Sequence, residues 1–318
     1  MTATPEQIKH ACMILFFHNV GICARSGRYS RSRAVVGVRS RELDPSASPL
    51  DYYGYELRRC REAAGLTLAQ LGSIVFCTGS LIGQIETAAK VPQRDFSERV
   101  DAALGTDGLF SRLVGLVLRS QLPGWFQPYA ELEAKAAYIS TYQCQLVYGL
   151  LQTESYARAV LAVDHARRLD EVVAARMDRQ RMLEREQPPV LWVVLDEAVL
   201  HRAIGRRQVM REQLAHRLDL FGQPWLEIQV LPFSAGEHTG MMGSFNLLRF
   251  DSDPDLHYNE SYDQGHMTAN PQVIRERSVG YARLQAAALS PKDSAALIAR
   301  VMEERYGEQP ERDASAVA

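Results

Sequence analysis

The stretch "LTLAQLGSIVFCTGSLIGQIE", residues 66–86, decides how the first part of the chain folds. Its apolar residues recur at helical spacing in two short groups, and a turn-like segment around Cys77 separates the groups. Thr67 and Thr78 each stand just before one group, where a threonine side chain can cap a helix N-terminus. The stretch therefore predicts two short helices joined by a tight turn.

Two crossed helices of this kind bury one face and leave the outer side of the second helix free, as in a helix-turn-helix. The residues predicted to point inward are Leu66, Leu71, Ile74, Leu81, Ile82 and Ile85. Those predicted to point outward are Gly79, Ser80, Gly83 and Gln84. The second helix has no lysine or arginine, and each of its two glycines costs about 1 kcal/mol relative to alanine. The same glycines let the backbone approach a partner closely.

Helical spacing of apolar residues continues on both sides of this stretch, from Tyr53 to Gly105. Gly65 and Gly105 lie where glycines commonly end helices. We therefore predict an all-α helix-turn-helix domain of four to five helices at residues 53–119.

Residues 1–52 are predicted to be a poorly ordered N-terminal extension, whose last part, 40–52, is rich in Ser, Pro and Asp like a linker. The segment "CMILFFHNVGIC", residues 12–23, resembles the apolar core of a signal peptide. It is too short to span a bilayer, and the basic run after it has no small-residue cleavage site of the usual kind. An alternative start codon at Val38 would leave residues 1–37 out of the native protein.

The charge balance of the whole chain gives no general attraction to nucleic acid or to an anionic membrane. The 318 residues contain 36 basic and 38 acidic side chains, a formal net charge of -2. Any DNA binding must therefore come from a local surface. The 5 cysteines are scattered without a C-x-x-C pair, which is typical of reduced thiols in the cytoplasm.

A second, larger domain is predicted after a boundary near Ser120, because two prolines interrupt the helical pattern in "RSQLPGWFQPYAELEAKA", residues 119–136. Its pattern predicts an α+β domain at 120–306, followed by a disordered tail at 307–318. Helices are expected at 155–163, 167–186, 197–204, 209–221, 272–289 and 291–306. Strands are expected at 190–196, 225–233, 243–251 and 256–262.

The stretch from Leu57 to Gly105 resembles the phage-repressor-like (XRE-type) helix-turn-helix, on the order of "LRRCREAAGLT", "LIGQIE" and the later Pro92. The resemblance implies that Glu86 braces the fold against a first-helix arginine, Arg58 or Arg61. Two positions depart from the family pattern. They are Phe76, where glycine is usual in the turn, and Leu68, where many phage repressors carry a glutamine.

These departures mean that the base contacts of phage repressors do not transfer to this chain. Ser80 and Gln84 remain for base contacts, and a glutamine can form a bidentate pair with adenine. Gly79 and Gly83 complete the surface offered to the duplex. The phosphate contacts are assigned to Thr67, Gln70, Thr78, Lys90 and Arg94. The plainer alternative is a small helical bundle that only packs on its neighbour.

Residues 122–306 resemble the domain that follows the helix-turn-helix in a large family of regulators from high-GC Gram-positive bacteria, sometimes described as antitoxin-like. The similar segments occur in one order and include "LVYGLLQTESYARAVL", "LDEAVLHRAIG", "IQVLPFSAGEH" and "ALSPKDSAALI". The resemblance implies a transcription regulator that is often encoded beside a small partner protein. It leaves the ligand of this domain unknown.

The sequence offers little catalytic or metal-binding chemistry. Glu197 and His201 are spaced to share one helix face, with Asp196 nearby, but an exposed helix pair explains them better than a metal site. His238 lies in a glycine-flanked loop of the kind where ligands bind. Neither G-x-S-x-G nor G-x-x-x-x-G-K occurs. We therefore expect no catalytic residues, no metal and no cofactor.

Three aromatic residues, Trp125, Phe126 and Tyr129, gather at the predicted domain boundary. Together with His238 they are candidates for a ligand pocket or a partner surface. The ordinary explanation for the three rings is packing between the domains.

The sequence thus predicts a cytoplasmic transcription regulator that binds double-stranded DNA as a homodimer, without membrane association. The alternative is an antitoxin-like interaction protein that binds a small partner protein encoded nearby, with DNA binding secondary. A hydrolase that retains a vestigial DNA-binding domain is the third possibility.

Overall fold

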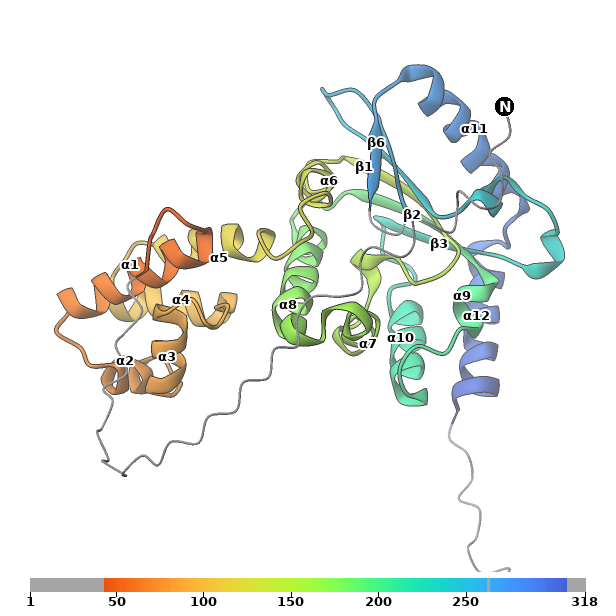
Figure 1. Ribbon diagram of the computed structural model, residues 1–318. Helices are drawn as coiled ribbons and strands as arrows, with labels where there is room; N and C mark the ends of the chain where they lie inside the picture. Colours follow the sequence, from red (N-terminus) through yellow and green to blue (C-terminus); the bar gives the residue numbers. More distant parts are fainter. Residues whose placement is uncertain (1–42, 262–263, 308–318) are drawn as a thin grey trace, which may run out of the picture. The chain divides into compact units, whose positions relative to one another are not determined.

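The computed structural model describes residues 43–261 and 264–307 (Figure 1). Residues 1–42 of the predicted extension and 308–318 of the predicted tail lie outside the described part of the chain. Within that part, a purely helical domain precedes a domain of helices and a six-stranded sheet. The predicted fold class, an all-α helix-turn-helix domain followed by an α+β domain, is confirmed.

The N-terminal domain, orange to yellow in Figure 1, is built from five helices around one apolar core. Its core side chains include Tyr53, Leu57, Leu71, Ile82 and Phe110, none of them measurably exposed. The helices are α1 (Pro49–Ala63), α2 (Leu68–Ile74), α3 (Gly79–Glu86), α4 (Arg94–Leu104) and α5 (Leu109–Arg119).

The first helix begins earlier than predicted, because part of the segment taken for a linker starts α1. Ser48 caps the helix by accepting a hydrogen bond from the Asp51 N–H, and Pro49 occupies the first helical position. Serine, proline and aspartate are also the residues that start helices. Composition alone therefore did not distinguish a linker from a helix N-terminus here.

Helices α2 and α3 form the predicted pair, and the chain bends by 110° between them. Thr67 and Thr78 cap them as expected, each accepting a backbone N–H of its own helix. One inward assignment was wrong: Ile74 is 47% exposed, whereas Val75 is fully buried. Val75 stands four residues after Leu71, so it takes the next position on the buried face.

The sheet of the second domain has the order β3-β2-β1-β4-β5-β6. The first three strands run parallel, and β4, β5 and β6 each run antiparallel to the preceding neighbour in that order. The strands are β1 (Tyr138–Gln143), β2 (Val190–Asp196), β3 (Leu226–Leu231), β4 (Phe245–Arg249), β5 (Leu256–Glu260) and β6 (Gly265–Thr268).

Four of these strands match the predicted ones, but β1 and β6 were missed. Strand β1 lies in the middle of the sheet and buries Ser140 and Thr141, which do not stand out as core residues in a sequence. Thr141 is satisfied because its hydroxyl donates to the Asn246 amide oxygen at 2.6 Å. The apolar pattern failed because a hydrogen bond, not an apolar neighbour, accommodates this buried side chain.

Helices cover both faces of the sheet, with one apolar cluster on each side. The smaller cluster includes Tyr281 and Leu284 of α11 (Pro271–Ala287), and the larger one includes Leu297 and Ile298 of α12 (Pro291–Tyr306). The other α-helices of this domain are α6 (Gln127–Glu133), α7 (Glu154–His165), α8 (Leu169–Gln180), α9 (Glu197–His201) and α10 (Arg207–Asp219). Short 3₁₀ turns are η1 (Gly149–Leu151), η2 (Ala166–Arg168), η3 (Arg181–Glu184), η4 (Phe233–Ala235) and η5 (Thr239–Met242).

No single helix among residues 43–261 and 264–307 is long and apolar enough to cross a membrane. The bent α2–α3 pair meets the requirements of length and composition only when its two helices are counted together.

Candidate nucleic-acid interface

The two glycines of α3 have different structural roles. A Cβ on Gly79 would lie 3.0 Å from the Ala69 nitrogen and 3.0 Å from the Leu68 carbonyl carbon. Backbone cannot give way as a flexible side chain can, so Gly79 is required by the close crossing of α2 and α3. The prediction that Gly79 points outward was therefore wrong. A Cβ on Gly83 would meet only the tip of the Leu68 side chain, at an ordinary 3.5 Å. The packing therefore does not require glycine at position 83.

Ser80 and Gln84 form the reading surface of α3, a name used below for these two exposed side chains. They lie one helical turn apart, and neither side chain has a hydrogen-bond partner within the described residues. A free amide and a free hydroxyl both match the donors and acceptors on base edges. The described part of the chain therefore leaves these polar groups without an intramolecular partner.

The three residues assigned to phosphate beside the helix pair are also exposed. Thr67 and Gln70 form a reciprocal capping box, so the Gln70 oxygen already accepts the Thr67 N–H at 2.8 Å. The amide nitrogen of Gln70 donates to no acceptor among residues 43–261 and 264–307. The Thr78 oxygen accepts the Leu81 N–H at 3.2 Å and leaves the hydroxyl proton free. Each side chain thus keeps a donor for a phosphate oxygen.

The turn between α2 and α3 contains a strained residue. Phe76 has a φ of 58°, in the left-handed region that glycine adopts freely and bulky residues avoid. Its ring is 86% exposed, so packing does not compensate for the backbone conformation. The position therefore has a backbone geometry that glycine adopts freely, but it carries phenylalanine.

A buried ion pair supports α3 from behind. Arg61 of α1 binds Glu86 through two contacts, Nε to Oε1 at 2.5 Å and Nη2 to Oε2 at 2.9 Å. Arg58 approaches the same carboxylate, with its Nε 3.6 Å from Oε2. Both arginines named by the resemblance therefore contact Glu86, and Arg61 makes the bidentate pair.

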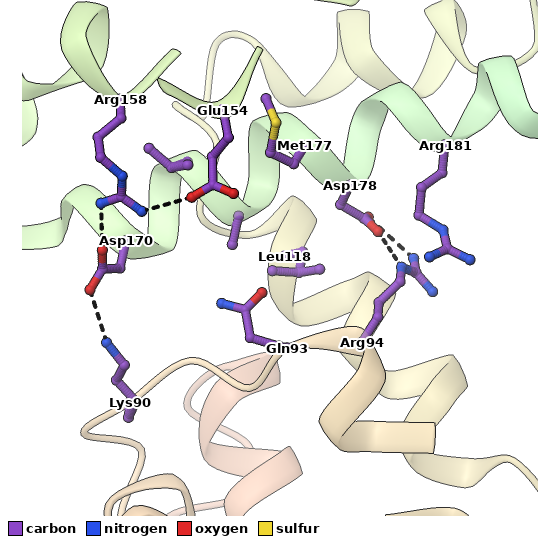
Figure 2. A pocket seen from close by; sticks show the side chains of 12 residues that line it. Lys90, Gln93, Arg94, Leu118, Glu154, Arg158, Asp170, Met177, Asp178 and Arg181 are labelled. Carbon is purple, nitrogen blue, oxygen red and sulfur yellow. Dashed lines mark hydrogen bonds and ion pairs between the residues drawn. The ribbon is translucent and has the colours of Figure 1, made fainter. Parts of the chain in front are cut away.

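The two cations assigned to phosphate are held by carboxylates of α8 instead of facing solvent freely. Lys90 Nζ lies 3.2 Å from Asp170 Oδ2, and Arg94 makes two contacts with Asp178 (Figure 2). The hydrogen bond to Asp178 raises the pKa of Arg94. Bonds from Arg158 and Lys90 lower the pKa of Asp170. Lys90 and Arg94 are therefore paired with carboxylates of the same chain, Asp170 and Asp178.

A cavity of about 480 Å³ lies between these ion pairs. Figure 2 shows side chains of α4 and α5 on one side and of α7 and α8 on the other. Its walls include Gln93, Leu118, Glu154, Met177 and Arg181. Ala174 of α8 packs against the core of the N-terminal domain. Helix α8 of the second domain therefore contacts the helix-turn-helix domain.

The aromatic residues near the boundary do not pack between the domains, so the ordinary explanation proposed for them was wrong. Phe126 and Tyr129 are 8% and 1% exposed and belong to the core of the second domain, and Trp125 packs against that core. Tyr129 stacks on Tyr258 with ring centroids 3.8 Å apart. Phe126 and Tyr129 also line a cavity in that domain.

His238 lies apart from this aromatic group. Its Nδ1 accepts the Gly240 N–H at 3.2 Å, and its Nε2 lies 3.7 Å from Asp196 Oδ2. Tyr142 donates to the same aspartate at 3.0 Å. The four candidate ligand residues therefore fall into two separate environments.

Glu197 and His201 of α9, for which a helix pair was preferred to a metal site, contact each other. Glu197 Oε1 and His201 Nε2 are 3.4 Å apart, and the other Glu197 oxygen accepts the Phe233 N–H at 2.7 Å. Within the described ranges, no three or more His, Cys, Asp or Glu side chains gather in a group suited to a metal ion.

Sequence reasoning missed Asp170 and Asp178 as partners of the helix-turn-helix domain. The charged face of this helix was visible, but the two pairs join residues 80 and 84 positions apart. No local pattern specifies such a partner.

Comparison with known families assigns both domains. A profile described as "Helix-turn-helix domain" matches residues 53–112, and one described as "Domain of unknown function (DUF5753)" matches residues 126–300. No curated protein and no solved structure matches the sequence significantly. The second match spans more than half of the chain. The protein therefore belongs to the DUF5753 family, and it carries this domain behind an XRE-like helix-turn-helix domain.

Proposed function

We propose that this protein is a sequence-specific DNA-binding transcription regulator of the cytoplasm. The main support is the reading surface, Ser80 and Gln84, which is exposed and makes no hydrogen bond within the described residues. It lies on the second of two helices that cross at 110°. In a helix-turn-helix this helix enters the major groove and its polar side chains contact base edges. Glutamine at position 84 favours adenine at one position of the operator.

Binding affinity is expected to be modest for one subunit. Thr67, Gln70 and Thr78 are neutral, and Lys90 and Arg94 are paired with α8. If two or three phosphates were neutralised per subunit, the slope of log affinity against log salt would be roughly -2 to -3. We therefore propose that the protein binds as a homodimer, which doubles the number of contacts. We also propose that it is not an enzyme.

Gel shift with the upstream region of the protein's own gene tests this function. The full chain should retain this DNA more strongly than a scrambled duplex of equal length. Gln84→Ala should remove most of the preference while leaving the fold intact, because the side chain is exposed and unpartnered. Gln208→Ala, at an exposed glutamine of α10, is the matched control and should retain the preference.

Ile85→Ala serves as the unfolding control, because Ile85 is 1% exposed in the domain core. Its truncation should cost about 2–5 kcal/mol of stability and remove DNA binding through loss of fold. If Gln84→Ala binds with unchanged preference, the reading surface is wrong. Retention only in the presence of a neighbouring gene product would favour the antitoxin-like interaction protein instead.

A further inference from the structure

Helix α8 has two chemically different faces. Asp170, Ala174 and Asp178 recur every four residues and face the helix-turn-helix domain. Arg176 and Arg179 lie on the other side of the helix and line a cavity of the second domain. Helix α8 therefore contacts both the helix-turn-helix domain and the cavity of the second domain.

The second cavity measures about 170 Å³ and lies where β1 and β5 end and β4 begins. Its lining combines aromatic rings with charged groups, including Phe126, Tyr129, Tyr148 and Tyr258 beside two arginines and Glu260. Sites for drug-sized ligands measure roughly 300–1,000 Å³, so this cavity suits a smaller metabolite.

One of the two arginines is already neutralised. Arg179 Nε lies 2.7 Å from Glu133 Oε2, and the side chains are 8% and 0% exposed. The other Glu133 oxygen accepts hydroxyl protons from Tyr129 at 2.9 Å and Tyr148 at 2.5 Å. The guanidinium of Arg179 also lies 4.9 Å from the centroid of the Phe126 ring. Arg179 is therefore held in the wall of the cavity by Glu133 and Phe126 and is not available as the main partner of an anionic ligand.

Arg176 differs because no carboxylate within the described ranges lies at ion-pair distance from it. Its one hydrogen bond goes from Nη1 to the neutral Gln152 oxygen at 3.0 Å. Burial, and then the like charge of Arg179, lower the pKa of Arg176 to about 10. A partly buried cation without a counterion is unfavourable, and an anionic ligand would relieve that cost.

Glu260 places a negative charge in the lining of the same cavity as Arg176. It is exposed at the end of β5, and one of its oxygens accepts the Tyr258 hydroxyl at 3.0 Å. Its other oxygen has no hydrogen-bond partner among the described residues. The cavity therefore presents an arginine without an ion-pair partner among the described residues, a carboxylate acceptor and an aromatic wall.

We propose that this cavity binds a small carboxylic acid that also carries a hydrogen-bond donor, as α-amino and α-hydroxy acids do. The ligand carboxylate binds Arg176, its donor binds Glu260, and its apolar part packs against the tyrosine rings. A phosphate dianion is disfavoured because Glu260 and Glu133 flank the two arginines.

Ligand binding also gives α8 a regulatory role, and this second part rests on the proposed DNA-binding function. A ligand that binds Arg176 acts on the same helix whose opposite face holds Lys90 and Arg94. Ligand binding in the cavity therefore changes the strength of the ion pairs that Lys90 and Arg94 make with α8, and with it the availability of both cations to DNA.

Isothermal titration calorimetry with the full chain and no DNA tests the site. The probes are the proteinogenic amino acids, the 2-hydroxy acids of matching side chain and the amides of both sets. At least one acid should bind with saturation, and its amide should not. Arg176→Gln should weaken that binding about 10- to 100-fold, as expected for a charge-assisted contact. Arg275→Gln, at an exposed arginine of α11, should bind normally.

Binding of the amino acids alone assigns an ammonium group to Glu260, and binding of the hydroxy acids alone assigns a hydroxyl. In either case Glu260→Gln should weaken the ligand, and Arg176→Lys should restore part of the loss in Arg176→Gln. Circular dichroism checks that the variants fold. The proposal is overturned if no acid in the set binds, or if Arg176→Gln and Glu260→Gln, both folded, bind as the parent does.

The regulatory part is measured separately, by repeating the gel shift with the acid that binds. A changed DNA affinity supports the coupling through α8, and an unchanged affinity refutes the coupling while leaving the site intact. Failure to bind DNA with or without the acid would count against the proposed function alone.

Discussion

The two glycines of α3 show how one residue type can serve two purposes within five positions of a helix. Gly79 is enclosed by the backbone of α2, whereas a Cβ on Gly83 would meet only the end of the Leu68 side chain. Packing explains the first glycine. Close approach of DNA remains the explanation we predict for the second.

Alanine at each position separates these purposes. Gly79→Ala should destabilise the domain by about 1–3 kcal/mol, because the added methyl overpacks the helix crossing. Gly83→Ala should stabilise it by about 0.5–1 kcal/mol, because alanine is the better helix former. Guanidinium unfolding measures both. In gel shifts, Gly83→Ala should weaken DNA binding despite its higher stability, and unchanged binding would show that DNA does not approach this backbone.

Phe76 has a backbone conformation that is unfavourable for a residue with a bulky side chain. Phe76→Gly should stabilise the protein by about 1–2 kcal/mol, the cost of a left-handed conformation for a residue with a Cβ. Phe76→Ala is the control, because it removes the exposed ring but keeps the strain. In thermal unfolding, Phe76→Gly should have the highest midpoint temperature of the parent and the two variants. Equal gains in the two variants would mean that the ring, not φ, causes the instability.

At the scale of elements, α4 holds the start of α5 through a single carboxylate. Asp101 accepts the backbone N–H groups of Phe110 at 2.9 Å and Ser111 at 2.8 Å, and also the Thr106 and Ser111 hydroxyls. Gly108, the N-cap residue of α5, provides no side-chain cap. Asp101 thus satisfies the helix N-terminus from outside the helix.

This contact makes the stability of α5 depend on pH. Burial alone would raise the pKa of Asp101, but the hydrogen bonds from Ser111, Thr106 and Phe110 outweigh burial and hold its pKa below the ordinary value. Because the folded-state pKa is depressed, the contribution is complete above the unfolded-state pKa of about 4 and is lost as the pH falls through the folded-state value. Amide hydrogen exchange in α5 should therefore speed up on acidification.

Asp101→Asn should remove about 1–3 kcal/mol of that protection at neutral pH and flatten its acid dependence. Asp107→Asn is the matched control, since Asp107 is exposed and asparagine tolerates its positive φ of 50°. A parent protein whose α5 protection does not change below pH 4 would contradict the role of Asp101.

At the scale of the whole molecule, the second domain holds the two cations that the first was expected to offer to DNA. The combined change Asp170→Asn and Asp178→Asn should release Lys90 and Arg94. If both then contact phosphate, DNA affinity rises and the salt slope steepens by about 0.9 for each contact. Fluorescence anisotropy at several salt concentrations measures both quantities.

A matched pair controls for the lost negative charge. Asp164→Asn combined with Asp253→Asn removes the same charge from exposed positions that make no ion pair among the described residues. This control should change the salt slope less than the α8 pair does. Equal slopes in both variants would show that the ion pairs do not withhold the cations.

Local chemistry was enough to predict the helix-turn-helix itself. Thr67 and Thr78 cap the helices within three residues of themselves, and the buried side chains of the pair recur at helical spacing. Strands β2 and β3 and the closing helices α11 and α12 could also be predicted, because their apolar residues repeat at the period of the element they form.

Only the tertiary structure decided what depends on distant partners. Thr141 is acceptable in the centre of the sheet because Asn246 lies opposite it, and Lys90 is occupied because Asp170 lies opposite it. The cavity beside Arg176 likewise exists only where α6, α8 and three strands meet. A sequence records caps and periodicity within a few neighbouring residues, whereas the partners of these polar groups are set by how the elements pack.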